Sequence, residues 1–137
     1  MRRSATITLH WLSLLLWVLL VAGGPLPVLA WAFGRVGLAL CTIALLRGLM
    51  NGPGPKLEGP LRAAHPWLSR AMYAALGAVA AATLWHLAVE PVTGITQLHF
   101  YMMSAASLHA IFHLWRHTAL GDGALRRITP AALHGML

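Results

Sequence analysis

Long runs of apolar residues, broken by short clusters of glycine and proline, make up most of the chain. A membrane-spanning helix needs roughly 20 consecutive apolar residues. Four segments meet this requirement, and the expected helices cover approximately residues 4–22, 28–50, 65–89 and 95–119. The connections between them, GGPLP, NGPGPKLEGP and EPVTG, contain the residues that end helices. Short connections join antiparallel neighbours, so the pattern predicts an all-α, up-down-up-down four-helix bundle with a short tail at 120–137.

The composition agrees with a lipid environment. Hydrophobic residues make up 58% of the 137 positions and charged residues only 9%, far fewer than a soluble domain carries. We therefore expect one integral membrane domain. The N-terminal run is similar to a signal peptide, but it is long and His10 interrupts it, so we favour a retained first span over a cleaved signal. The single cysteine, Cys41, lies in an apolar stretch and indicates packing rather than a disulfide.

Basic residues gather on one side of the expected bundle. They precede the first span, flank the second connection and follow the fourth span: Arg2, Arg3, Arg47, Lys56, Arg62, Arg70, Arg116, Arg126 and Arg127. The two opposite connections have only Arg35 between them. By the positive-inside rule, both termini are expected in the cytoplasm. The formal net charge of +7 follows mostly from this bias, and no soluble basic face indicates nucleic-acid binding.

Histidines inside the spans are the first candidates for function, because a polar group in hydrocarbon costs several kcal/mol unless it is paired. His10 lies roughly two turns from the start of the first span, and His109 a little over two turns from the end of the fourth. Two imidazoles at equal depth on different helices can provide the two axial ligands of a b-type haem. The small residues of SAAS (104–107) leave room for such a ring. We therefore expect one haem b, with His10 and His109 as the iron ligands.

The remaining intramembrane histidines have other interpretations. His86 and His99, near the outer ends of the third and fourth spans, form a second candidate pair for a haem, although we favour hydrogen bonding to water at the outer interface. His113, His117 and Arg116 lie near the inner interface. There they form either a solvated cluster or the contacts of a quinone head group or an anion. The four-residue spacing of histidines on this helix face also suits zinc or copper, but no carboxylate lies within a span to complete such a site.

Three stretches together resemble the bacterial cytochrome b561 family, four-helix membrane proteins that carry haem b. They are TLHW at 8–11, LLRGLMNGPGP at 45–55 and LHAIFHLWRHTALGDGALRRITP at 108–130. The resemblance implies that His10 and His109 match the ligands of the family's cytoplasmic-side haem. It also implies that Arg116 and His117 match the polar pair that follows, and that the chain lies in a bacterial inner membrane.

Two positions depart from the family's pattern. Where the family places its outer haem ligands, this chain has Phe33 and Ile95, which cannot ligate iron. A haem-sized void would forfeit packing contacts, so we expect side chains or a guest molecule to fill the outer pocket. Trp31, Phe33, Ile95 and Phe100 are the residues suited to that role.

The expected function is electron transfer by a membrane-bound b-type cytochrome that exchanges electrons with a quinone or a redox partner. The resemblance implies quinone reduction, superoxide oxidation, or service in a larger membrane redox complex. The alternative is a degenerate structural subunit of such a complex, which binds lipid, pigment or quinone in the vacated haem space. A metal-dependent membrane enzyme is the least favoured hypothesis, and the chain has no dinucleotide-binding fingerprint.

Overall fold

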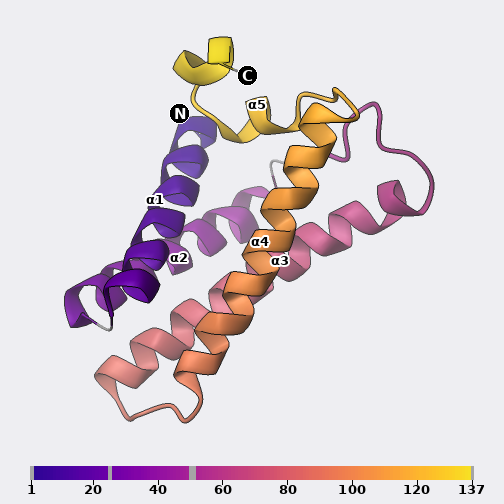
Figure 1. Ribbon diagram of the computed structural model, residues 1–137. Coiled ribbons are helices and arrows are strands. Elements are labelled where there is room, and N and C mark those ends of the chain that lie inside the picture. Colours follow the sequence, from indigo (N-terminus) through magenta and orange to yellow (C-terminus); the bar gives the residue numbers. More distant parts are fainter. Residues whose placement is uncertain (1, 25, 50–51, 137) are drawn as a thin grey trace.

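The computed structural model describes residues 2–24, 26–49 and 52–136, and the regular elements of these residues are all helices. They are α1 (Arg2–Gly23), α2 (Pro27–Arg47), α3 (Gly59–Ala88), α4 (Ile95–Thr118), α5 (Ala124–Ile128) and a 3₁₀ segment, η1 (Ala131–Met136). Successive long helices run in opposite directions, and the two chain ends lie at the same end of the molecule as α5 (Figure 1). We call this the α5 end and the opposite one the far end. The prediction of an all-helical chain is confirmed.

Two helix boundaries differ from the expected ones, and glycine or proline lies at each of them. α2 stops at Arg47, before the expected end at 50, because Gly48 has a positive φ of 75°. α3 begins at Gly59 rather than at 65, so the expected start was wrong. A proline in the first turn of α3, Pro60, takes the place that proline favours, whereas Pro66 lies inside the helix. At 30 residues, α3 is about 45 Å long, which exceeds the thickness of a hydrocarbon core.

Within the described residues, three helices are long and apolar enough to cross a membrane: Arg3–Gly23, Pro27–Arg47 and Gly59–Ala88. α4 has sufficient length, 24 residues, but it is more polar because it carries four histidines together with Gln97 and Arg116. Large apolar side chains such as Leu45, Trp67 and Leu108 point away from the protein. A soluble protein would bury most side chains of this kind, so the exposed surface suits lipid.

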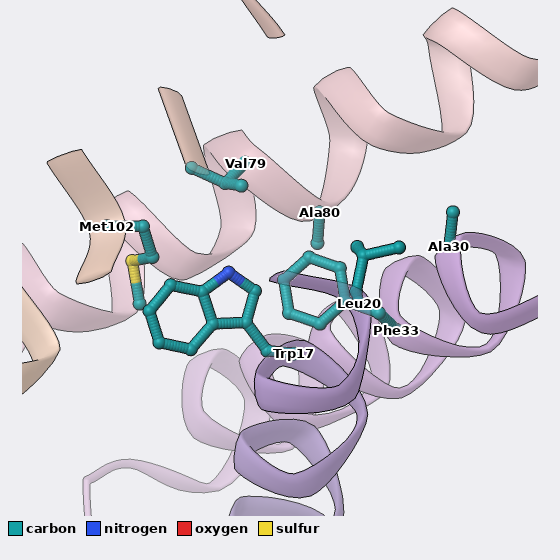
Figure 2. Close-up of a cluster of buried hydrophobic side chains, with 7 residues drawn as sticks. All are labelled: Trp17, Leu20, Ala30, Phe33, Val79, Ala80 and Met102. Atoms are coloured by element: carbon teal, nitrogen blue, oxygen red, sulfur yellow. The ribbon is translucent and has the colours of Figure 1, made fainter. Parts of the chain in front are cut away.

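An apolar core joins the four long helices in the half of the bundle toward the far end (Figure 2). Its fully buried members are Trp17, Leu20, Ala30, Phe33, Val79, Ala80 and Met102. Phe33 is only 1% exposed, so the prediction that side chains fill its position is confirmed. Phe100 is 63% exposed, and its expected role as a filler was wrong. Successive helical residues are about 100° apart, and Phe100 points away from the face on which Met102 lies.

Glycines bring α2 and α3 into close contact. A Cβ atom at Gly34 would lie 2.5 Å from Cγ of Leu84 and 3.2 Å from the carbonyl oxygen of Ala80. A Cβ atom at Gly37 would lie 3.0 Å from that of Ala80. Small residues at such positions allow two backbones to approach, which is how helices associate in a bilayer.

Candidate functional site

A cavity of about 260 Å³ lies between the helices, on the α5 side of the apolar core. One water molecule needs roughly 15 Å³, so the cavity is much larger than a packing defect. All four long helices line it with mainly apolar side chains, and residues of α5 border it at the α5 end. Trp17, Phe33 and Met102, which belong to the core, close it toward the far end.

His10 on α1 and His109 on α4 both line this cavity. Beside His109 the cavity wall consists of Ala106 and Ala110, whose methyl side chains leave space. The structure therefore brings together, in one apolar space, the two histidines that the sequence predicts as a pair.

His113 is a third imidazole at the cavity wall. Its ring centroid lies 4.5 Å from that of His109 and 6.0 Å from that of His65. His117, which was grouped with it on the basis of sequence, is partly buried near the end of α4 and does not line the cavity. The structure thus separates the two histidines expected to contact a quinone or an anion.

The cavity histidines differ from the others in their hydrogen bonding. Among the described residues, the ring nitrogens of His10, His109 and His113 have no hydrogen-bond partner, whereas other histidines of the long helices are bonded to protein groups. His86 Nδ1, for example, accepts a hydrogen bond of 2.9 Å from the backbone N–H of Val92, in the α3–α4 connection. Three histidines with unbonded rings therefore line the cavity, and Nδ1 of the buried His65 also has no partner.

His99 uses both of its ring nitrogens within the protein. Its Nδ1 accepts a hydrogen bond of 3.1 Å from the indole N–H of Trp17. The hydroxyl of Thr83 donates its proton to the carbonyl of Val79 at 2.7 Å, so the 3.0 Å contact between Thr83 Oγ1 and His99 Nε2 requires His99 to donate. His99 is therefore a neutral imidazole with the proton on Nε2. His99 thus has protein partners at both ring nitrogens and His86 at Nδ1, while the expected hydrogen bonding to water at the outer interface stays a prediction.

Ser13 provides an unsatisfied polar group beside the histidine pair. It lies three residues after His10, on the same face of α1, and it lines the cavity. The residue is 5% exposed, and its Oγ has no hydrogen-bond partner in the described structure. A buried hydroxyl without a partner costs about 1–3 kcal/mol, which a polar atom of a bound molecule would offset. Ser13 was not predicted from the sequence, because serines are common in membrane helices and nothing in its neighbourhood singles it out.

A buried ion pair closes the α5 end of the bundle. Arg116 Nε donates to Oδ2 of Asp122 at 2.8 Å, and Nη2 donates to the same oxygen at 2.5 Å. The Nη1 group lies 2.8 Å from Nε2 of His65, and Nη2 also donates to the carbonyl of Pro53. Arginine can only donate, so His65 must accept at Nε2 and carry its proton on Nδ1. We call these residues the Arg116 network.

The Arg116 network changes the interpretation of two residues. Arg116 is 1% exposed and these protein groups engage its guanidinium, but it also lines the cavity, so its expected contact with a quinone or an anion stays a prediction. His65, also 1% exposed, is a structural member of the same network. Asp122 additionally accepts a 2.8 Å hydrogen bond from the backbone N–H of Ala124, which fixes the start of α5.

α5 is also attached to the opposite side of the cavity. The indole N–H of Trp11 donates to the carbonyl of Ile128 at 2.8 Å, and Arg3 donates to the carbonyl of Arg126 at 3.0 Å. The tail therefore bridges from α4 to α1 across the α5 end of the cavity, as the course of the chain in Figure 1 also shows.

Comparisons of the chain with protein-family models, curated proteins and solved structures find no match. The resemblance in the three stretches therefore stays a prediction. Among the described residues, no group of three or more histidine, cysteine, aspartate or glutamate side chains is placed to hold a metal ion. The zinc or copper site considered along α4 thus gains no support. A haem iron takes only two ligands from the protein, so a site for it would not form such a group.

Proposed function

We propose that this protein is a membrane-bound b-type cytochrome in which His10 and His109 hold one haem b. The observation that carries the proposal is that two imidazoles from different helices, with unbonded nitrogens, face one apolar cavity. A haem with two histidine ligands supplies one-electron transfer and leaves no open position on its iron for substrate. The chain's own residues orient the imidazoles and exclude water, and a quinone or a redox partner would exchange the electrons.

The absorption spectrum of the purified full-length protein tests this proposal. We expect a reduced α-band typical of haem b, with one haem per chain. His109→Ala should abolish it, because the loss of one axial ligand leaves the other imidazole unpaired in lipid. His86→Ala is the matched control, since His86 lies away from the cavity and is bonded to Val92. An unchanged low-spin spectrum in H109A would contradict the ligand assignment.

The proposal includes α4 as a fourth span, with both termini in the cytoplasm of a bacterial inner membrane. Two observations support it. The histidines that make α4 polar, His109 and His113, face the cavity rather than lipid. The chain ends and the basic side chains of Arg3, Arg62 and Arg127 share the α5 end, as the positive-inside rule requires. A reporter active only in the periplasm should give no signal when it is fused after residue 137, and a strong signal would overturn this orientation.

The apolar character of the cavity wall also favours a second candidate function. A structural subunit of a larger membrane complex could hold lipid, pigment or quinone in the same space. The absorption spectrum separates the two candidates, because such a subunit shows no haem band. Mass spectrometry of the purified protein would then identify the apolar guest.

A further inference from the structure

A second arginine at the α5 end, Arg127, forms no ion pair with a carboxylate of the described residues. Arg127 on α5 borders the cavity. Its Nη1 donates to the carbonyl of Gly52 and its Nη2 to the main-chain carbonyl of Asp122, both at 3.1 Å. The carboxylate of Asp122 already forms an ion pair with Arg116, and no other ion pair is found among the described residues. The two other acidic side chains of the sequence are exposed to the surroundings.

The two guanidinium groups converge on one glycine. A Cβ atom at Gly54 would lie 2.7 Å from Nη2 of Arg116, 2.7 Å from Nη2 of Arg127 and 2.9 Å from Oδ2 of Asp122. The buried Arg116–Asp122 pair and the partly exposed Arg127 therefore place two positive charges and one negative charge side by side. An anion next to Arg127 would offset the excess positive charge.

We propose that Arg127 binds the carboxylate of an amphipathic molecule whose apolar body occupies the cavity. A guanidinium offers five N–H donors, of which the two main-chain carbonyls take two. Its planar fork matches a carboxylate, and the bond is strengthened by both charges. The position of Arg127 at one end of an apolar cavity orients the guest, with its acid toward the α5 end and its hydrocarbon toward Trp17 and Phe33.

Haem b bears two propionate carboxylates, so it is one candidate for this molecule. To that extent the inference deepens the proposed function and rests on it. The cavity and the unbalanced charge of Arg127 would equally suit a long-chain fatty acid. The test therefore uses both chemistries with the full-length protein in a nonionic detergent. One arm measures the affinity of haem-depleted protein for haem b and for its dimethyl ester. The other arm measures the affinity for a fluorescent polyunsaturated fatty acid and for its methyl ester.

We expect the wild-type protein to bind the acid about tenfold more tightly than the ester, as a charge-assisted hydrogen bond predicts. Arg127→Gln should remove this preference and retain the affinity for the ester, which also shows that the variant folds. Arg126→Gln is the matched control, because Arg126 is the exposed neighbour of Arg127 and does not line the cavity. It should keep the full preference.

The outcomes separate the two proposals. If neither haem b nor its ester binds, the proposed function fails, and the fatty acid still decides the role of Arg127. Equal affinities for acid and ester in every arm in which binding occurs, or a preference that R127Q retains, would overturn the inference. If R127Q loses ester binding as well, the variant Arg127→Lys is tested in its place. Lysine keeps the charge without the fork, so the preference should fall severalfold, and an unchanged preference in R127K would contradict the assignment.

Discussion

Removing the charge of Asp122 should destabilise the protein strongly. Asp122 is 8% exposed and Arg116 is 1% exposed, so the change Asp122→Asn leaves a guanidinium buried without its counterion. Breaking a buried ion pair from one side costs about 3–5 kcal/mol. The asparagine oxygen can still accept the hydrogen bond from Ala124, which favours the lower end of this range, about 3 kcal/mol. For a chain of this size, that corresponds to a fall in the unfolding midpoint on the order of 10 °C.

The assay is thermal unfolding of the purified protein in detergent, followed by the fluorescence of its six tryptophans. Glu58→Gln is the matched control, because Glu58 is an exposed carboxylate whose side chain makes no capping hydrogen bond to α3. It should leave the midpoint within about 2 °C of the wild-type value, as surface changes usually do. A D122N midpoint as close to wild type as that of E58Q would refute the reasoning, since the ion pair would then contribute nothing to stability.

Two further predictions concern packing, with the same assay. Phe33→Ala should lower the free energy of unfolding by about 3–5 kcal/mol, because it empties a buried site in the core. Phe100→Ala removes an outward-facing ring and should change the midpoint little. Equal effects of the two changes would contradict the core assignment. Gly34→Ala should destabilise by about 1–3 kcal/mol, since its Cβ would lie 2.5 Å from Leu84, whereas at Gly77 the nearest atom would be 3.5 Å away and alanine should be tolerated. A Gly34→Ala variant as stable as Gly77→Ala would show that α2 and α3 adjust freely.

The periodic and compositional signals predicted the helices well, because long apolar runs and helix-ending residues are local properties of the chain. The early start of α3 was missed because two prolines competed for the first turn, and only tertiary structure places Pro66 inside a helix. The pairing of His10 with His109 was available from their depths along the spans. The partners of His99 were not, since they depend on the rotation of three helices around their axes.

The Arg116 network shows a different limit of sequence reasoning. Arg116 and Asp122 are six residues apart, across the end of α4, and the only aspartate of the chain was treated as part of a polar tail. The tail folds back, and the aspartate meets a buried arginine. That arginine also contacts His65 of α3 and Pro53 of the α2–α3 connection. Partners from another part of the chain leave no local pattern, so the sequence did not predict that His65 and Pro53 also bind the guanidinium of Arg116.

The close contact of α2 with α3 has a consequence for biogenesis. These two helices pack backbone to backbone through Gly34 and Gly37, whereas α1 and α4 approach each other much less closely across the cavity. Small residues that let two backbones approach favour helix association in a bilayer, so α2 and α3 can pair before α4 joins the bundle, and α1 also packs against α2. The hydrogen bond from Trp11 to Ile128 can form only after α5 has been synthesised. Until then the residues of α5 do not border the cavity, and the space beside His10 stays open at the α5 end.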